Sequence, residues 1–440
     1  MTSMSKLDPE FEVTITRMNH SGEGVGRYKN RSIFVFGAIV GERVLVRPIK
    51  VSRGKAKAAI ISILDKSPDR RPEREDHYLS CSPWQIIAYH KQLEYKIDVA
   101  KKIFINETGV VPDENVEIVK SDREWNYRNK MEFSFVKKAN EELTLAFHIR
   151  GRRYDCYELD ECVLASKKLN EVAREVMKVL NERKIAIEQL KNLVLRYSYL
   201  EDKCLVILYV KNEDFSVFDL NIADAVGWQI IYSDPKSPST VITKVLHVQG
   251  RDYLEEQVDF LKLRYRHSNF FQINPLIFGT LLNYVKDNIK PGGDVIDLYS
   301  GVGTIGLFLT KQFKKIMSVE LDDEAVKIEA ENIAINDLKN ITVHSGASEK
   351  QNLTGILAMA NTLVVDPPRS GLHPKVVKAI LNSKIKQFVY ISCNPLTQAK
   401  DFRLLKQKYK VLKWRLFDLY PQTPHMESVL ILRRKIFGIF

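Results

Sequence analysis

Apolar and polar positions alternate along the first part of the chain in short runs that glycines interrupt. The segment "RSIFVFGAIVGERVLVRPIKV" is typical of residues 9–65, where period-two alternation predicts strands and the Gly-rich stretches predict turns. Gly22, Gly24 and Gly26 are too closely spaced for a helix and indicate a tight loop. This pattern predicts a small all-β barrel, followed by a polar, proline-containing linker at residues 65–76.

The middle of the chain mixes helical and strand patterns. Residues 85–108 repeat apolar side chains with the period of an amphipathic helix, and residues 163–184 do so again. The segments "YRNKMEFSFVK", "ELTLAFHIRGRR", "LVLRYSYL" and "CLVILYVK" alternate like paired strands. We therefore expect a mixed α+β domain over residues 77–265.

From about residue 268, buried strands alternate regularly with amphipathic helices. The strands are "DVIDLYS", "KIMSVEL", "ITVHSG", "NTLVVDPPRSG" and "QFVYISCNP". This order predicts an α/β fold with a doubly wound, mostly parallel sheet, whose ligands lie at the carboxyl ends of the strands. The predicted domains are the barrel at residues 1–68, the α+β domain at 77–265 and the α/β domain at 266–440.

The charge distribution favours a polyanionic partner. The chain of 440 residues has a formal net charge of +12, and residues 1–71 carry +7 of it. A small basic barrel is a common platform for nucleic acid, although such a barrel can also serve only to pack against its neighbour. Arg150, Arg152 and Arg153 form a second basic cluster, which either contacts the polyanion or is a solvated face.

Other bulk features narrow the class of protein. No run of about 18 apolar residues predicts a membrane span, and the first residues lack the apolar core of a secretory signal. The five cysteines are irregularly spaced, which fits reduced thiols better than a disulfide framework. We expect a cytoplasmic protein without membrane contact, and no obligate protein partner is evident.

The segment "GVGTIG" at residues 301–306 matches a glycine-rich ligand loop. It lies between a predicted strand and a predicted helix, and Glu320 follows the next strand, where a carboxylate can bind ribose hydroxyls. Nicotinamide dinucleotides and S-adenosylmethionine (SAM) are both bound by this geometry. The glycines alone do not distinguish the two ligands, and an ordinary strand-to-helix turn is a third reading.

Two later strand ends favour SAM and a carbon atom as the methyl acceptor. Asp366 in "DPPRSG" is followed by two prolines, which make a stiff wall beside a ligand. In amino-group methylases a related loop carries an aromatic residue where this chain has Arg369. Cys393 ends the next strand, and a thiolate that adds to C6 of uracil makes C5 nucleophilic. Glu427, just ahead of a late strand, is a candidate base for the C5 proton. The alternative interpretations are that Cys393 is a buried apolar cysteine and that Glu427 is a surface glutamate.

Taken in order, the motifs resemble those of the RNA uridine-C5 methyltransferases, SAM-dependent enzymes that make 5-methyluridine in tRNA and 23S rRNA. "HSGEGVGR" (20–27) resembles the start of a TRAM domain, an OB-like RNA-binding barrel, and "SNFFQINP" (268–275) resembles the opening of the catalytic domain. "DLYSGVGTIGL", "VEL", "DPPRSGL", "SCNP" and "HMESV" follow in family order. The resemblance implies a class I SAM-methyltransferase sheet in the C-terminal domain.

The resemblance also implies roles for the matching residues. Cys393 would be the nucleophile and Glu427 the general base. Phe270 would contact the target base, although core packing is its ordinary reading. Relatives often carry Asn at the position of Thr304. The residues implied to line the SAM site are Gln272, Tyr299, Thr304, Glu320 and Asp366.

One departure from the family concerns metal binding. Many relatives hold an iron–sulfur cluster through a C-x5-C-x2-C group after the barrel and one distant cysteine. This chain has only Cys81 in the first group, displaced by about one position, and Cys162 at the distant position. Because such a cluster normally needs four thiolates, we expect no iron–sulfur cluster and no metal.

The sequence thus predicts methylation of uridine C5 in RNA through a covalent adduct between Cys393 and C6. An N-terminal barrel is typical of the rRNA enzymes and of some tRNA enzymes, which favours 23S rRNA and keeps tRNA as an alternative. An NAD-binding oxidoreductase and a non-catalytic RNA-binding protein are further alternatives. Titration with SAM and NAD tests the first, and release of the C5 hydrogen of uridine tests the second.

Overall fold

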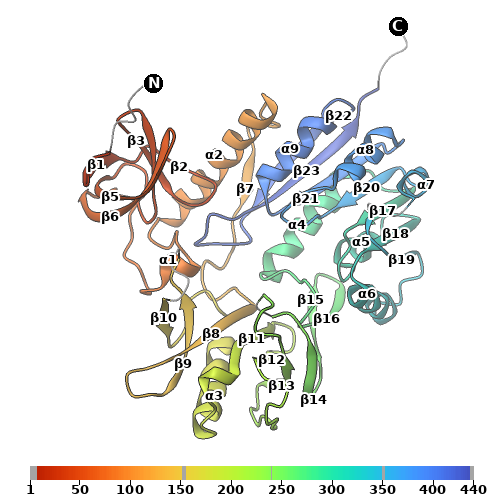
Figure 1. Ribbon diagram of the computed structural model, residues 1–440. Coiled ribbons are helices and arrows are strands. Elements are labelled where there is room, and N and C mark those ends of the chain that lie inside the picture. Colours follow the sequence, from red (N-terminus) through yellow and green to blue (C-terminus); the bar gives the residue numbers. More distant parts are fainter. Residues whose placement is uncertain (1–6, 151–154, 239, 349–351, 437–440) are drawn as a thin grey trace.

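The computed structural model describes residues 7–150, 155–238, 240–348 and 352–436, so Arg152 and Arg153 lie outside the described residues. The chain forms three lobes: an N-terminal β-lobe, a central α+β lobe and a C-terminal α/β lobe (Figure 1). The helices of the described ranges include none that is both long and apolar enough to cross a membrane.

The N-terminal lobe is a six-stranded sheet with the order β1-β5-β6-β4-β3-β2. The sheet curls around a core of alternating side chains such as Val13, Ile33 and Val44. Thr16 N donates to Val25 O, 3.0 Å away, and so joins the segment after β1 to β3. The strands are β1 (Phe11–Thr14), β2 (Arg17–Met18), β3 (Gly24–Tyr28), β4 (Arg31–Val35), β5 (Arg43–Ser52) and β6 (Lys55–Asp65).

The three closely spaced glycines differ from the expected tight loop. Gly22 lies in a turn with a φ of +81°, but Gly24 and Gly26 lie inside β3. A Cβ atom at Gly24 would lie 2.6 Å from Ala38 O, and one at Gly26 would overlap Thr14 O. The tight-loop prediction is therefore wrong for these two glycines, which allow neighbouring backbones to approach closely.

The central lobe is a seven-stranded sheet with the order β10-β9-β8-β11-β12-β13-β14, covered by one amphipathic helix. The predicted strand pairs form β8–β9 and β11–β12, both antiparallel. The helix α3 begins after Ser166, whose side chain accepts from Leu169 N as an N-cap. The elements are β8 (Lys130–Lys137), β9 (Leu143–His148), β10 (Cys156–Leu159), α3 (Lys167–Glu182), η1 (Ile187–Gln189), β11 (Leu190–Ser198), β12 (Lys203–Val210), β13 (Ala225–Tyr232) and β14 (Lys244–Gly250).

The C-terminal lobe contains an eight-stranded sheet with the order β19-β18-β17-β20-β21-β23-β22-β7. The first five strands are parallel, and β23 is antiparallel to both of its neighbours. A separate hairpin, β15 (Tyr253–Val258) and β16 (Leu261–Arg266), leads into this lobe. The strands of the sheet are β7 (Glu117–Val119), β17 (Asp294–Leu298), β18 (Lys315–Glu320), β19 (Ile341–Ser345), β20 (Thr362–Val365), β21 (Gln387–Ser392), β22 (Tyr409–Phe417) and β23 (Glu427–Arg434).

Helices lie on both faces of this sheet, as expected for a doubly wound fold (Figure 1). Strands β20 and β21 are almost wholly buried because helices cover them on both sides. The helices of this lobe are α4 (Pro275–Asn288), α5 (Thr304–Leu309), α6 (Asp323–Ile335), α7 (Leu353–Ala358), α8 (Pro374–Asn382) and α9 (Pro395–Leu405).

Part of the segment assigned to the central domain packs on the C-terminal sheet instead. Strand β7 pairs with β22, and α2 (Tyr89–Thr108) packs along α9. Phe104 on α2 is fully buried, and its ring lies 4.8 Å from that of Trp414. The apolar face predicted for residues 85–108 is thus buried by the C-terminal lobe, while the short α1 (Tyr78–Cys81) lies by the central lobe.

Candidate active site

The predicted site residues lie on neighbouring strands at one edge of the C-terminal sheet. Along the strand order β18-β17-β20-β21-β23, the carboxyl ends carry Glu320, Tyr299, Asp366 and Cys393, and β23 begins at Glu427. Parallel strands place their carboxyl ends at the same edge, and the antiparallel β23 begins where β21 ends. Because Ser392 pairs with Ser428, the residue after one and the residue before the other meet at this edge.

Cys393 lies in a turn that is fastened to the Pro-Pro loop. Asn394 caps α9 by accepting from Leu396 N, and its Nδ2 donates to Arg369 O, 2.9 Å away. Thr397 Oγ1 donates to the same carbonyl at 3.2 Å. The Asn-Pro break therefore ends β21, starts α9 and fixes the cysteine relative to "DPPR".

The environment of Cys393 keeps the resting thiol protonated. Burial raises the pKa of the Cys393 thiol to about 12, and the carboxylates of Glu427 and Asp366 act in the same direction. The Arg369 guanidinium opposes this rise in pKa. Arg369 is thus the neighbour that favours the thiolate, which the sequence did not reveal as a partner of the cysteine.

Glu427 is a buried carboxylate and not a surface glutamate, with 2% of its area exposed. Its Oε1 accepts a hydrogen bond from Tyr420 Oη at 2.8 Å, and its Oε2 has no hydrogen-bond partner among the described residues. Burial, with a smaller effect of Asp366, raises the pKa of Glu427 above its usual range. A raised pKa makes this carboxylate a stronger base than an exposed one, and its free oxygen can accept a proton.

The carboxyl group of Asp366 has a raised pKa as well. Burial raises the pKa of this carboxyl to about 7. Pro367 follows it directly and holds the chain at the end of β20. Asp366 therefore offers a hydrogen-bonding group that can be either charged or neutral at the pH of the cell.

The glycine loop after β17 presents backbone toward open space. Gly301 has a φ of +57°, and no atom of the described residues beyond Gly301 and its two chain neighbours lies within 4 Å of where its Cβ would be. Glu320 Oε2 accepts from Gly301 N at 2.8 Å, and its Oε1 accepts from Leu321 N and Asp322 N. Tyr299 also has a positive φ, of +65°, and Thr304 begins the six-residue α5. These residues shape the loop at the carboxyl end of β17.

Buried acids below this loop were not found from the sequence. Asp297 Oδ2 accepts from Gly306 N at 2.9 Å, and Ser300 Oγ donates to Glu329 Oε2 at 2.7 Å. Burial raises the pKa of Glu329 to about 7. Asp297 lies in the motif "DVIDLYS". A polar residue inside an otherwise hydrophobic strand is the sequence signal that could have revealed it. The acids fix the loop from its inner side.

Gln272 and Phe270 precede α4 and differ strongly in exposure. Gln272 is 5% exposed, its backbone O accepts from Asn129 Nδ2 at 3.1 Å, and its Oε1 has no partner within the ranges the structure describes. Phe270 is 67% exposed. The alternative prediction that Phe270 packs in the core is therefore wrong, and its exposed ring is free to contact a ligand.

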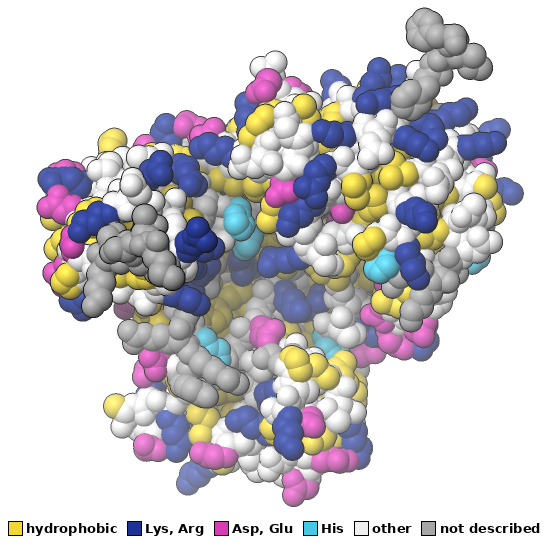
Figure 2. All heavy atoms as spheres, turned by 45° about the horizontal axis from the view of Figure 1, so that its top comes forward, with side chains coloured by type: hydrophobic (Ala, Val, Ile, Leu, Met, Phe, Trp, Pro, Cys, Tyr) yellow, Lys and Arg dark blue, Asp and Glu magenta, His cyan; other side chains and the backbone are white. Residues whose placement is uncertain are grey.

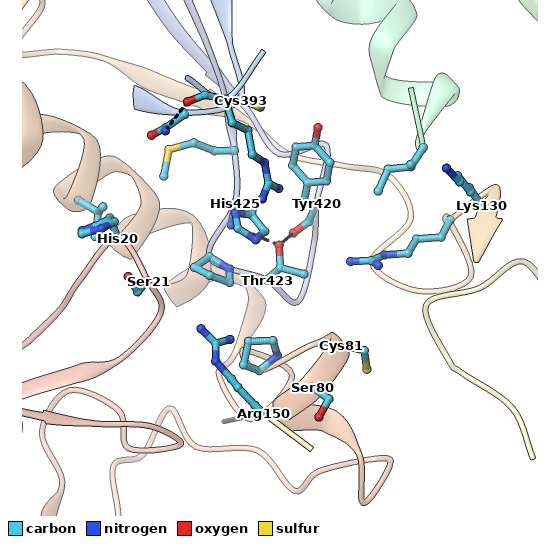
Figure 3. Close-up of a pocket in the computed structure, with 18 of the residues that line it drawn as sticks. His20, Ser21, Ser80, Cys81, Lys130, Arg150, Cys393, Tyr420, Thr423 and His425 are labelled. Atoms are coloured by element: carbon cyan, nitrogen blue, oxygen red, sulfur yellow. Dashed lines mark hydrogen bonds between the residues drawn. The ribbon is translucent and has the colours of Figure 1, made fainter. Parts of the chain in front are cut away.

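A cavity of about 730 Å³ lies in front of Cys393, between the three lobes. Figure 3 shows this cavity surrounded by His20 and Ser21 of the N-terminal lobe, by Lys130 of the central lobe, and by Cys393, Tyr420 and His425 of the C-terminal lobe. Figure 2 shows Lys, Arg and His side chains gathered around the hollow. The basic and histidine residues of the lining are His20, Arg128, Lys130, His148, Arg150, Arg369 and His425.

This cavity is large and positively charged enough to hold a polyanion. Arg150, one of three arginines noted in the sequence, lies on its wall, and its guanidinium stacks 4.0 Å from the Phe36 ring. Residues from all three lobes form one surface, so a bound chain would touch the barrel, the central lobe and the strand ends together. The arrangement combines a strand-end thiol, a buried carboxyl group and a basic surface.

Comparison with known proteins agrees with this arrangement. Residues 88–435 match the family model described as tRNA (uracil-5-)-methyltransferase, and residues 9–61 match the TRAM domain. An uncharacterized RNA methyltransferase of Caldanaerobacter subterraneus is 31% identical, covering 96% of this chain and 98% of that protein. An uncharacterized RNA methyltransferase of Clostridium acetobutylicum is 28% identical, covering 97% and 98%.

A solved structure shares the complete fold. The tRNA (uracil-54, C5)-methyltransferase of Pyrococcus abyssi, in complex with S-adenosyl-L-homocysteine, has a TM-score of 0.78 and 24% identity, covering 96% of this chain and 100% of that one. The predicted SAM-methyltransferase fold with an N-terminal TRAM domain is thereby confirmed. The family match does not support the alternatives of an oxidoreductase or a non-catalytic protein. We conclude that the chain belongs to the tRNA (uracil-5-)-methyltransferase family, as an RNA uracil-5 methyltransferase.

Proposed function

We propose that this enzyme methylates C5 of a uridine in RNA through a covalent bond between Cys393 and C6, with Glu427 as the general base. The observation that carries the proposal is the pairing of Ser392 with Ser428, which sets the thiol beside the carboxylate at one sheet edge. The carboxylate of Glu427 is close enough to Cys393 to raise the pKa of the thiol. A single base bound at this edge can be reached by both groups.

The polar groups around the glycine loop fit SAM. The ammonium and hydroxyl groups of SAM are hydrogen-bond donors, and Glu320 and Asp366 carry acceptor oxygens. The unpaired Oε1 of buried Gln272 supports a further contact, and the open side of Gly301 leaves space for the ligand. We therefore propose that SAM is held by Gln272, Tyr299, Thr304, Glu320 and Asp366.

The chemistry follows from what the two protein groups can do. Cys393 reacts as its thiolate, which Arg369 favours, and forms a bond from Sγ to C6 so that C5 becomes nucleophilic. SAM, when bound, supplies a methyl group attached to a positively charged sulfur. Once C5 carries the methyl group, Glu427 takes the remaining C5 proton. The electron pair of that C–H bond restores the C5–C6 double bond and expels the Cys393 thiolate.

The target base must leave its stack to reach this edge. Sequence-selective RNA enzymes act on unstacked or flipped bases, and the exposed ring of Phe270 supports a stacking role beside such a base. The basic wall of the cavity, with residues such as Arg128 and Arg150, supports binding of the flanking phosphates. The TRAM lobe forms part of the same wall through His20 and Ser21.

Two RNA classes are candidates. The N-terminal barrel supports 23S rRNA, which we favour, whereas the structural neighbour from Pyrococcus abyssi is a tRNA enzyme. Mass-spectrometric mapping of 5-methyluridine in total RNA, with and without the gene, decides between them. Loss of the modification from a 23S rRNA uridine supports our choice, and loss from tRNA alone contradicts it. If neither RNA changes, uridine C5 is not the target.

A further inference from the structure

Four potential metal ligands meet at the junction of the linker with the central lobe. Glu75 lies near the end of the linker, and Cys162 precedes α3. His77 comes directly before the short α1, and Cys81 is the last residue of that helix. One donor atom from each side chain lies within 4.8 Å of all the others. The two segments are far apart in the sequence, so the fold itself assembles this set.

Two of the four donor residues are buried, the other two are partly buried, and their hydrogen bonding is incomplete. Cys162 is fully buried, and His77 is 5% exposed. His77 Nε2 lies 3.3 Å from Glu75 Oε2, yet it forms no hydrogen bond with any described residue. Cys81 Sγ is 3.9 Å from the same Glu75 oxygen. A buried imidazole nitrogen that converges with a carboxylate and two thiols, and that makes no hydrogen bond to any described residue, lies in an environment suited to a cation.

Outer contacts hold two of the ligands in place. Glu75 Oε1 accepts from Val163 N at 2.5 Å, which leaves Oε2 for the centre of the group. Asn170 accepts from Cys162 N at 3.1 Å and donates to Cys162 O at 3.0 Å. Such supporting hydrogen bonds are typical of structural metal sites because they orient the ligands in advance.

We propose that Glu75, His77, Cys81 and Cys162 bind one Zn²⁺ ion. Two sulfurs, one nitrogen and one carboxylate oxygen suit tetrahedral zinc, whereas Mg²⁺ and Ca²⁺ prefer oxygen ligands. With metal bonds of about 2.0–2.3 Å, tetrahedral donors lie roughly 3.3–3.8 Å apart, so the present group needs only a small contraction.

The charge of the surroundings also fits zinc. Two thiolates and a carboxylate carry three negative charges, and Zn²⁺ neutralises two of them. The buried Arg128 guanidinium is close enough to both thiols to interact with them electrostatically and can balance the third. This assignment departs from the expectation of no metal, because Glu75 and His77 supply the ligands that the missing cysteines do not.

The ion would join the linker and α1 to the central lobe. Ser80 and Cys81 lie on the wall of the cavity, and Ser80 Oγ donates to His148 O at 2.9 Å. Zinc at this place therefore fixes one wall of the RNA-binding cavity without contacting Cys393. The site is a structural one, separate from methyl transfer.

The test measures metal directly in the full-length protein. Protein purified without chelators should contain one zinc per chain, and Co²⁺ added to metal-free protein should give the visible absorption of a tetrahedral site with sulfur ligands. Cys162→Ala and His77→Ala should each lower zinc affinity by at least about tenfold. Cys204→Ala is the matched control, because Cys204 is also fully buried in the central lobe but lies outside the group.

Several results would overturn the assignment. Iron with acid-labile sulfide in anaerobically purified protein would show a cluster in place of zinc. Absence of both bound zinc and a Co²⁺ spectrum, or equal loss of metal in Cys204→Ala, would remove the site. If Cys162→Ala fails to fold, His77→Ala and the Co²⁺ titration of the unaltered protein decide the matter. Retention of zinc in Cys393→Ala keeps this test independent of the methyl-transfer proposal.

Discussion

Cys393 and Cys81 border the same cavity, but their neighbours give them different chemistry. Cys393 is at a strand end, where one guanidinium lowers the pKa of its thiol and two carboxylates raise it. Cys81 is beside a second thiol, an imidazole and a carboxylate. A thiol with one cationic neighbour and a nearby base can attack and leave, whereas a thiol among several donor groups is suited to hold a metal ion. The position on a cavity wall therefore does not identify a nucleophile by itself.

The largest effect that this comparison predicts is on Cys393. Cys393→Ala should reduce methyl transfer by at least about 10³-fold, because no thiolate remains to activate C5. SAM affinity should stay within about threefold of the unaltered enzyme, and the zinc content should be unchanged. Methyl incorporation into RNA and calorimetric titration with SAM measure both. Cys156→Ala is the control, since Cys156 is a partly exposed thiol outside this site. Product formed by Cys393→Ala at a near-normal rate would show that Cys393 is not the nucleophile.

The second largest effect concerns the base. Glu427→Gln should slow turnover by roughly 10²–10⁴-fold and accumulate a protein–RNA adduct, because addition at C6 remains available while removal of the C5 proton is blocked. A band that survives a denaturing gel and requires both SAM and RNA measures the adduct. Slow turnover without any adduct would assign proton removal to another group.

A smaller effect on methyl transfer is expected from substitution of Tyr420. Tyr420 is a positioning residue for Glu427, the base that belongs to the Cys393 site and not to the Cys81 site. Its hydroxyl donates to Glu427 Oε1 and favours the ionised carboxylate, which lowers the pKa of Glu427. Tyr420→Phe should therefore raise the pKa of Glu427 and move the acidic limb of the pH–rate profile to higher pH. A displacement of one pH unit corresponds to about a tenfold loss on that limb.

The profile of kcat/KM against pH measures this change. Activity on the alkaline plateau should fall much less than activity on the acidic limb, because Glu427 is ionised there in both proteins. Tyr95→Phe alters a tyrosine packed against Trp84 and serves as the control. A uniform loss at every pH would indicate a packing defect and would count against the positioning role.

The smallest effect is on stability. The pKa of Asp366 is raised from 3.8 to about 7 by burial. The stability linked to this group is fully present below pH 3.8 and is lost as the pH rises through about 7. Asp366→Asn should thus stabilise the SAM-free protein at pH 8 relative to pH 5, by roughly 1–4 °C in Tm. Melting curves at the two pH values measure this, and an equal Tm change at both would show that Asp366 does not titrate in this range.

The site's strand-end residues could be predicted because their positions follow from topology. Once five strands are recognised as parallel, Glu320, Asp366 and Cys393 must share one edge of the sheet. The partners supplied by loops could not be predicted in the same way. Tyr420 reaches Glu427 from a loop before β23, and Arg369 meets Cys393 only through the folded Pro-Pro loop.

The same limit applies to the fold. The apolar face of α2 is visible in the sequence, but whether it packs on the central or the C-terminal lobe depends on contacts with distant residues such as Trp414. In the sequence, Glu75 and His77 look like ordinary residues in and beside the linker, and only folding brings them to Cys162. Local pattern predicts elements and their order, whereas long-range packing decides which side chains meet.

The most direct test of the account is to identify the residue that bonds to uridine. RNA in which the target uridine is replaced by 5-fluorouridine has no C5 proton for Glu427 to remove, so the adduct cannot resolve. After incubation with SAM and digestion, mass spectrometry should find the methylated fluorouridine nucleotide on the peptide that contains Cys393. A complete reaction without any adduct, or an adduct on a different residue, would contradict the account.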